Sequence, residues 1–216
     1  AYKLFAHFVP SDPNYDTELV TVTLTINPKE LTVSAAFPEN YSRPYDGGVW
    51  IDPQLIVLSL GGIEEIDKDD VSLVAPVSSA SFESMNAGVR KANVTVSGDN
   101  LALEGTKKDN YKLPEHFDST LTTTNTAEIT KVPLVPSVAE DSVQDKTYDG
   151  TLDAAGTLTL AAQEGGPSIP ENETPAATGT FKFTDANAGE NKTVNVTGIT
   201  LGDGWDTNYT LTETSL

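Results

Sequence analysis

The chain has 216 residues, with 32 acidic and 13 basic side chains and a formal net charge of −19. This charge excludes nucleic acid as an expected partner, because a phosphate backbone needs a basic surface to offset it. The absence of cysteine excludes disulfides and thiolate metal sites. No apolar run approaches the roughly 20 residues of a membrane helix, so we expect no membrane insertion.

Strand-forming and turn-forming residues dominate the chain, and apolar residues alternate in short runs. Residues 18–26 show this most clearly, because Val20, Val22, Leu24 and Ile26 alternate with threonines, which predicts a strand with one buried face. The apolar run 55–60 predicts a buried strand.

Short strands recur at spacings of roughly 8 to 14 residues, with Gly, Asn or Pro between them. This spacing predicts an all-β fold of tandem immunoglobulin-like β-sandwich repeats. A β-grasp-like repeat is the alternative, although no segment shows the helical periodicity that such a fold needs.

The triplet Tyr45-Asp46-Gly47 recurs as Tyr148-Asp149-Gly150, 103 positions later (148 − 45). Further landmarks come after each triplet in the same order: Asn86 and Gly88 correspond to Asn187 and Gly189, and Tyr111 corresponds to Tyr209. A repeat of this length can bury its own core. The sequence therefore predicts two domains of one design.

The opening residues 2–8 match residues 111–117, so the chain begins with the end of another copy. We predict that residues 1–29 are the closing strands of an upstream repeat with a connector, that 30–131 form repeat 1 and that 132–216 form repeat 2. A start within a motif suggests an excised fragment or a processed form. The junctions contain Pro28 and Pro133 and run from strand to strand, which predicts semi-rigid connections.

The ordered set of motifs resembles the YDG-type tandem repeats of large bacterial surface and secreted adhesin-like proteins. Besides Tyr-Asp-Gly, the shared motifs are Phe-x-x-x-Asn-Ala-Gly, Val-x-Val-x-Gly and Asn-Tyr-x-Leu, each present in both copies. The resemblance implies a stalk or adhesin segment that is extracellular, at the bacterial cell surface or secreted. It attaches no catalytic activity to the repeat.

Two interpretations of the Tyr-Asp-Gly triplet are open. A tyrosine ring beside a carboxylate suits a sugar ligand, whereas Asp-Gly suits a tight turn in which glycine takes a left-handed conformation. The neighbouring tyrosine can bury its ring and bond its hydroxyl. Recurrence at one place in the repeat favours the structural role, and the same holds for the Asn-Ala-Gly and Asn-Tyr motifs.

A calcium site is conceivable at Asp67, Asp69 and Asp70, because closely spaced carboxylates are the ligands that calcium prefers. The segment lacks the pattern of an EF-hand loop, so a solvated acidic turn is the preferred interpretation. We predict no metal and no cofactor.

No constellation of nucleophile, base and orienting group is visible. The two histidines, His7 and His116, occupy equivalent repeat positions and so do not form a pair within one site. We therefore predict a non-enzymatic stalk or adhesin segment.

The alternative is a carbohydrate- or host-glycoprotein-binding module that uses Trp50, Trp205 and the loops that differ between the copies, 67–70 and 163–178. The expected partner is a host or environmental glycan or protein, and the chain is expected to be monomeric.

Overall fold

The computed structural model describes residues 2–16, 18–97, 101–115 and 119–216. The predicted all-β class is confirmed, since strands make up 42% of the structure and helical turns make up 6%. The helical turns among the described residues are short 3₁₀ segments. No helix in these ranges is long and apolar enough to cross a membrane.

Contacts divide the chain into two compact units. The first comprises Ala1–Ser34, Leu58–Pro76 and Val96–Ser119, and the second comprises Ala35–Val57, Val77–Thr95 and Thr120–Leu216. Repeat 1 as predicted from the sequence thus contributes to both units, whereas repeat 2 lies within the second.

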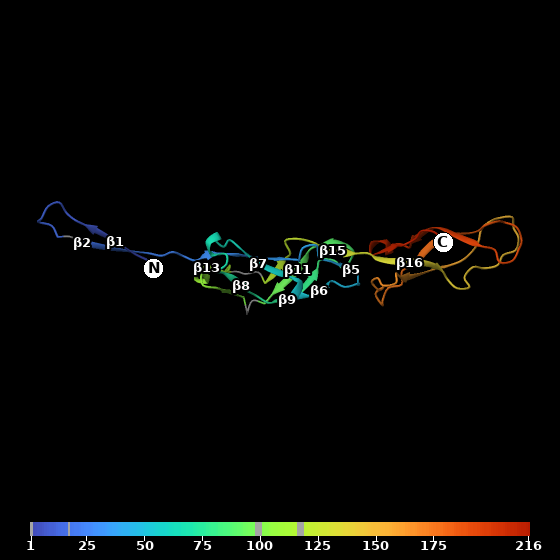
Figure 1. The fold of residues 1–216 in the computed structure, drawn as a ribbon, viewed down its shortest axis with the longest axis horizontal. Helices are drawn as coiled ribbons and strands as arrows, with labels where there is room; N and C mark the ends of the chain where they lie inside the picture. The colour runs from blue at the N-terminus through green and yellow to red at the C-terminus, as the bar shows by residue number, and fades with distance from the viewer. Residues whose placement is uncertain (1, 17, 98–100, 116–118) are drawn as a thin grey trace. The chain divides into compact units, whose positions relative to one another are not determined.

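The described residues of the first unit include the following strand pairs. Strands β1 (Tyr2–Phe8) and β2 (Glu18–Leu24) form an antiparallel hairpin, drawn in blue in Figure 1. Strand β3 (Lys29–Glu30) runs parallel to β13 (Tyr111–Lys112), and β8 (Ser72–Val74) runs antiparallel to β12 (Ala102–Glu104). Leu31, Val71 and Tyr111 form the core of this unit.

The prediction of a half-buried strand over 18–26 is wrong in two respects. The strand ends at Leu24, and its apolar residues are exposed: Val22 by 48%, Leu24 by 47% and Ile26 by 74%. The physical reason is that β2 pairs with β1 and no described segment covers its apolar face. Alternation shows that a strand is suited to burial, but burial also needs a second layer.

The prediction of a buried strand over 55–60 is confirmed in part, since a strand forms but begins later and is not buried. Residues Pro53–Leu55 form a 3₁₀ turn, because the Asp52 carboxylate accepts a hydrogen bond from the Gln54 N–H and proline suits the first helical position. The strand β7 (Val57–Gly61) begins after this turn and alternates between exposed and half-buried residues.

The part of repeat 1 in the second unit holds two sheets. Strand β15 (Ala127–Thr130) lies between β5 (Ser42–Pro44), which is parallel to it, and β10 (Gly88–Arg90), which is antiparallel. The second sheet has four strands, and the remaining pair, β4 with β7, has residues in each unit. The bounds of these strands are Thr32–Ala36 for β4, Trp50–Ile51 for β6, Val77–Phe82 for β9, Ala92–Val96 for β11 and Thr120–Thr122 for β14.

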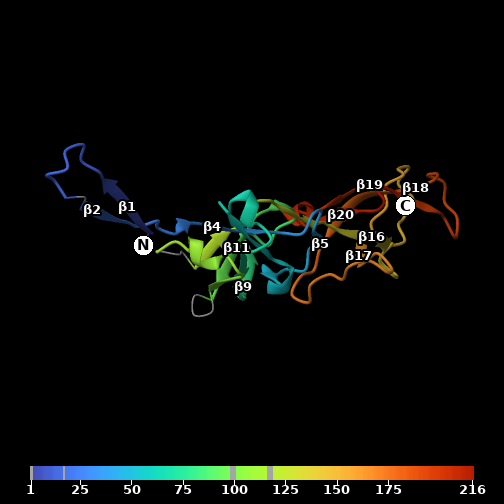
Figure 2. The same ribbon diagram turned by 60° about the vertical axis from the view of Figure 1, so that its left-hand side comes forward.

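Repeat 2 repeats this design with fewer strands. Strand β16 (Val132–Val138) lies between β17 (Leu158–Ala162) and β20 (Tyr209–Leu211), as Figure 2 shows. Strands β18 (Ala177–Phe183) and β19 (Val194–Leu201) form an antiparallel pair. Phe181, Val196 and Ile199 are the buried core.

Both repeats contain the same parallel strand pairing. Lys29, one residue before the predicted start of repeat 1, is paired with Tyr111, and Val132 is paired with Tyr209 in repeat 2. We call Tyr111 and Tyr209 the closing tyrosines, although β14 and β15 still follow Tyr111 in repeat 1. Only Lys131 separates β15 from β16, so the chain passes from one repeat to the next without a turn (Figure 1). The predicted boundary between residues 131 and 132 lies at this point.

Candidate functional site

The Tyr45-Asp46-Gly47 turn is held by a cation from the preceding strand. The Arg43 guanidinium forms an ion pair with the Asp46 carboxylate and donates to the Gly48 carbonyl at 2.6 Å. Asp46 in turn accepts the Gly48 N–H at 2.9 Å. The hydrogen bond from Arg43 lowers the pKa of Asp46. Gly47 has φ 76°, the left-handed conformation that glycine takes without strain.

The turn of repeat 2 is also held by a cation, Lys146, that contacts the aspartate of the motif. The Lys146 ammonium donates to Asp149 and to the Thr151 carbonyl, each at 2.9 Å. Asp149 accepts the Thr151 N–H at 2.8 Å, and Gly150 has φ 75°. The Lys146 hydrogen bond, followed by those from Thr151, lowers the pKa of Asp149 to about 2.

Each of the two cations also lies over a phenylalanine ring, with Arg43 at 5.2 Å from Phe82 and Lys146 at 5.6 Å from Phe183. In both copies, therefore, the cation that pairs with the motif aspartate is itself placed by a phenylalanine ring, and the aspartate finds its partners within its own turn.

The tyrosines of the two motifs have different surroundings. Tyr45 is 2% exposed, whereas Tyr148 is 66% exposed. Because the turns themselves match, this difference comes from what covers each ring.

Tyr45 is covered by repeat 2. The Tyr45 and Tyr209 hydroxyls donate to the two carboxylate oxygens of Glu173, one each, and the tyrosine rings meet edge to face at 5.8 Å between centroids. Trp205 packs edge-on against Tyr209 at 5.7 Å. Burial, and then the hydrogen bond to Glu173, raise the pKa of Tyr45 to about 12, and the same two causes raise that of Tyr209. We call Tyr45, Glu173, Tyr209 and Trp205 the tyrosine cluster.

Two more contacts join the repeats beside the tyrosine cluster. The Asn208 side chain accepts the Ala87 N–H at 2.9 Å and donates to the Asn86 side chain at 3.2 Å. A Cβ placed on Gly47 would lie 3.3 Å from Pro170, so the turn and the loop 163–178 are in close contact. The Asn-Ala-Gly, Asn-Tyr and Tyr-Asp-Gly motifs therefore meet at one place.

The counterpart of Tyr209 in the first unit is Tyr111, which donates to Asp67 at 2.8 Å and accepts the Glu64 N–H at 3.1 Å. Burial, the largest cause, raises the pKa of Tyr111. In each repeat the closing tyrosine thus binds a carboxylate from the loop that differs between the copies.

The calcium candidate residues have other roles in the structure. Asp67 accepts from Tyr111, and Asp70 accepts the Thr106 hydroxyl at 2.8 Å, while Asp69 is exposed. Within the described ranges no group of three or more His, Asp or Glu side chains gathers as metal ligands would. His116 and the side chain of His7 lie outside the described part of the structure.

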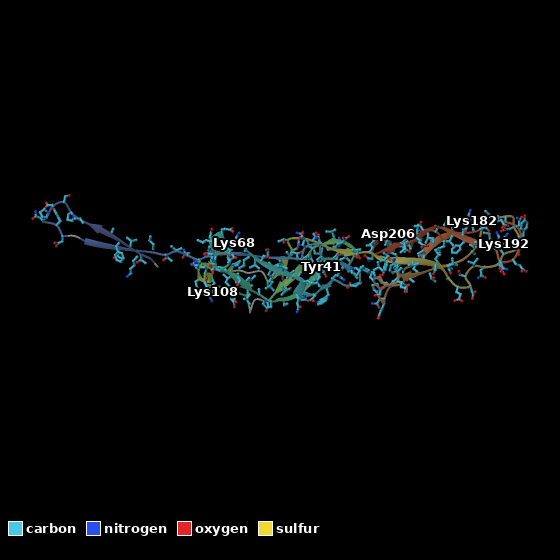
Figure 3. All side chains as sticks on the ribbon, in the orientation of Figure 1. Tyr41, Lys68, Lys108, Lys182, Lys192 and Asp206 are labelled. Atoms are coloured by element: carbon cyan, nitrogen blue, oxygen red, sulfur yellow. The ribbon has the colours of Figure 1, made fainter. Side chains whose placement is uncertain are left out.

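The two tryptophans differ in their surroundings. Trp50 is 66% exposed on β6, where it pairs with β9. The corresponding position of repeat 2 is Asp153, whose backbone forms an isolated antiparallel β-bridge with Lys182. Lys182 is labelled in Figure 3. Trp205 is half-buried in a 3₁₀ turn, Trp205–Thr207, where it supports Tyr209. Of the two tryptophans, Trp50 is thus the exposed one, and Trp205 is the one that packs against a buried tyrosine.

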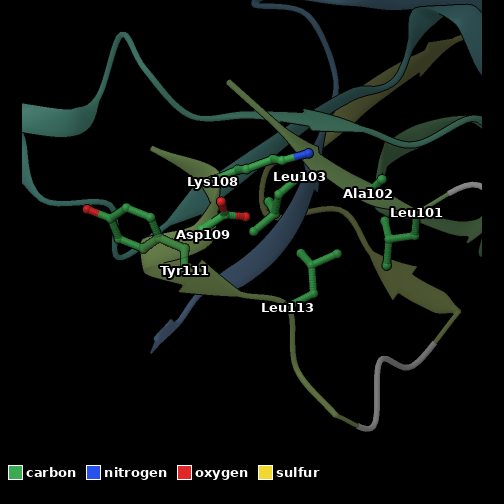
Figure 4. Close-up of a pocket in the computed structure, with 7 residues that line it drawn as sticks. All are labelled: Leu101, Ala102, Leu103, Lys108, Asp109, Tyr111 and Leu113. Carbon is green, nitrogen blue, oxygen red and sulfur yellow. The ribbon is translucent and has the colours of Figure 1, made fainter. Parts of the chain in front are cut away.

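A hollow of about 400 Å³ lies beside β13, the strand that begins at Tyr111 (Figure 4). Its lining is Leu101, Ala102, Leu103, Lys108, Asp109, Tyr111 and Leu113. A second hollow, of about 500 Å³, is lined in repeat 2 by residues that include Ile199, Leu201, Asp206, Tyr209 and Leu211. These are the same repeat positions, 98 residues on (209 − 111), so the hollows are a feature of the fold.

Sequence reasoning missed Glu173, the acceptor of both tyrosines, because nothing in its aperiodic loop marks it. It also missed the turn-holding role of Arg43 and Lys146. The sequence did hold a signal for this role, because both copies have a basic residue at the same distance before the motif aspartate.

The protein is of the tandem-repeat, all-β class. Each repeat contains a parallel pair of strands and a Tyr-Asp-Gly turn. The YDG domain family matches residues 27–123 and 129–216, so the chain belongs to the YDG domain family, with two tandem copies. Comparison with curated proteins and with solved structures finds no match.

Proposed function

We propose that this chain is a non-enzymatic, extracellular repeat module of a bacterial surface or secreted protein, and that it acts as a stalk or adhesin segment under tension. The observation that carries the proposal is the parallel pairing of β16 with β20, the first and last strands of repeat 2. When the two ends of a repeat are pulled apart, terminal strands that run parallel slide along each other. Their hydrogen bonds are then loaded together instead of breaking one after another.

The contacts between repeats support the same proposal. The tyrosine cluster and Asn208 join repeat 1 to repeat 2 through the hydroxyls of buried tyrosines and through half-buried amides, and such groups are costly to separate without replacement partners. The motif tyrosine, in this proposal, connects successive repeats and binds no ligand.

The test is single-molecule pulling of the chain from its two ends. We expect repeat 2 to unfold in one step, at a force well above that needed to open a hairpin bond by bond. Thr212→Pro removes the N–H that bonds to the Leu134 carbonyl at 2.9 Å and should lower this force. Thr212→Ala keeps that N–H and is the matched control. Equal forces for the two variants would contradict the proposal.

A second candidate function is binding of a glycan or glycoprotein, and it rests on Trp50. An exposed tryptophan that its repeat counterpart does not retain suits stacking on a sugar ring. A glycan array should then show binding that Trp50→Ala abolishes. Binding that survives this change, or an array without signal, removes the candidate.

A further inference from the structure

The four-stranded sheet of repeat 1 has one buried face and one face turned to solvent. Its strands lie in the order β14, β11, β9 and β6, of which the last three are labelled in Figure 1. Ile51 of β6, Phe82 of β9 and Val94 of β11 are buried. Because successive side chains of a strand point to opposite faces, their neighbours along each strand lie on the outer face. Trp50 is one of these neighbours, with 66% exposure.

Strands β9 and β11, in the middle of this sheet, run antiparallel. The Glu83 N–H donates to the Lys91 carbonyl at 3.2 Å at one end of the pair, and the Ser97 N–H donates to the Pro76 carbonyl at 3.0 Å at the other end. Counting two residues inward from the first of these bonds (83 − 2 and 91 + 2) brings residues 81 and 93 side by side.

One outward side chain of each strand therefore lies beside the next across the sheet. Trp50 is paired with Ser81, and Asn93 is paired with Thr122. Neighbouring strands are about 4.8 Å apart, so the four side chains together span about 14 Å. We call Trp50, Ser81, Asn93 and Thr122 the polar row.

The polar row carries no charge, although the chain has a net charge of −19. Asn93 and Thr122 are both exposed, and the Thr122 hydroxyl donates to the Asn93 side-chain carbonyl at 3.5 Å. Within the described ranges, the Asn93 side-chain N–H₂ has no acceptor, so its two donors face solvent. The next outward side chains along β9 and β11 are Glu83 and Lys91, whose opposite charges offset each other.

Repeat 2 does not retain the polar row. The positions of Trp50 and Ser81 are taken there by Asp153 and Lys182, by offsets of 103 and 101 (153 − 50 and 182 − 81). The backbones of Asp153 and Lys182 are paired in a β-bridge, so two charged residues stand where repeat 1 has a tryptophan and a serine. The outer face of repeat 2 is therefore an internal comparison surface of the same fold.

We propose that the polar row binds an uncharged oligosaccharide that lies across the strands, with one sugar ring stacked on Trp50 and the following rings bonded to Asn93 and Thr122. The apolar face of a sugar ring packs on an aromatic ring. Sugar hydroxyls both donate and accept hydrogen bonds, as amide and hydroxyl side chains require. An acidic glycan meets repulsion from the net charge of the chain, without a cation in the row to offset it.

This inference rests on the second candidate function, the binding of a glycan at Trp50. It adds the class of glycan, the residues besides Trp50 that hold it and the restriction of the site to repeat 1.

Heteronuclear NMR of the intact chain tests the proposal through the indole N–H signals of Trp50 and Trp205. The probes are oligosaccharides of glucose, mannose, galactose and xylose, with oligogalacturonate as the anionic match of the galactose series. We expect the Trp50 signal, assigned with Trp50→Phe, to move with at least one neutral series and not with oligogalacturonate, while the Trp205 signal stays in place. Affinity should rise from the monosaccharide to longer chains, because one ring covers only part of the row.

Two variants with matched controls identify the polar row. Asn93→Asp should weaken binding about twofold to tenfold, the loss expected for one hydrogen bond, and the exposed Asn195→Asp on β19 of repeat 2 is its control. Thr122→Val removes a hydroxyl, keeps the shape of the side chain and should weaken binding to a similar extent. Its control is the exposed Thr180→Val on β18. Unchanged dispersion of the NMR spectrum shows that each variant is folded.

The outcomes separate this inference from the candidate function on which it rests. If no neutral series moves the Trp50 signal at about 10 mM sugar, ten times a dissociation constant of about 1 mM, both are overturned. Binding that Trp50→Ala abolishes but that Asn93→Asp and Thr122→Val leave unchanged keeps the candidate function and overturns the polar row. Tighter binding of oligogalacturonate, or equal affinity for one sugar and for a chain, also overturns the polar row. The stalk proposal is tested separately, by the pulling force.

Discussion

Replacement of Glu173 by glutamine should destabilise the contact between the repeats by about 2 to 4 kcal/mol. The Glu173 carboxylate accepts one hydroxyl on each oxygen, from Tyr45 and Tyr209. A hydrogen bond to a charged group contributes about 1.5 to 3 kcal/mol. Glutamine keeps one acceptor oxygen but turns an N–H₂ toward the other hydroxyl. One bond is therefore weakened to that of a neutral pair and the other loses its acceptor.

The assay is urea unfolding followed by Trp205 fluorescence, because Trp205 packs against Tyr209. A Trp50→Phe background removes the exposed tryptophan, whose signal is unrelated to the cluster. Glu171→Gln is the matched control, since Glu171 is exposed, two residues away, and carries the same charge. A free energy of unfolding for Glu173→Gln within about 0.5 kcal/mol of this control, the range of ordinary surface substitutions, would refute the reasoning.

Three further predictions concern the turns and the cluster. Because the pKa of Tyr45 is raised to about 12, its share of stability should be complete below pH 10 and be lost as the pH rises from 10 through 12. The slope is about 1.4 kcal/mol per pH unit, measurable by urea titrations at each pH. The pKa of Asp149, held near 2 by Lys146, should rise toward 3.8 in Lys146→Met, as carboxyl NMR would show; an unchanged pKa would exclude Lys146 as the cause. Gly47→Ala and Gly150→Ala should each cost about 1 to 2 kcal/mol of backbone strain. Gly47→Ala should cost more in urea unfolding because its new Cβ meets a proline at 3.3 Å, whereas Gly150 has more open surroundings; equal costs would contradict this contact.

The fold class and the repeat could be predicted because their signals are local. Alternating apolar residues select strands, and Asp-Gly selects a turn with a left-handed glycine, which Gly47 and Gly150 show. A structural role could also be assigned to the Asn-Tyr motifs, whose tyrosines Tyr111 and Tyr209 lie buried. Because each of these motifs occurs in both copies, the prediction of its structure could be checked against a second example in the same chain.

The tyrosine cluster could not be predicted, because its parts are distant in sequence. Glu173 lies 128 residues from Tyr45, in a loop without periodicity. The carboxylate of the first unit, Asp67, comes from a different point of the repeat, so comparison of the copies does not align the two acceptors. The shared feature is a carboxylate at the closing tyrosine, and this becomes visible only once the strands are paired.

The exposure of residues 18–26 shows a second limit of sequence reasoning. Periodicity reports which side of a strand is suited to burial, but not whether the described chain supplies the layer that buries it. Ile26 and Ile129 occupy the same repeat position, yet one is exposed and the other is buried. The difference arises because β5 and β10 flank β15, whereas no described strand pairs with residues 25–28.

The most direct test of the proposal that the motif tyrosine connects successive repeats is a double-mutant cycle of Tyr45→Phe and Tyr209→Phe. The two residues belong to different repeats and share the Glu173 carboxylate. Each variant removes one hydroxyl and keeps the ring. We predict a coupling free energy of at least about 1 kcal/mol from urea unfolding, within the range for residues in one hydrogen-bond network. A coupling of zero within about 0.3 kcal/mol would mean that the two repeats do not act together at this contact.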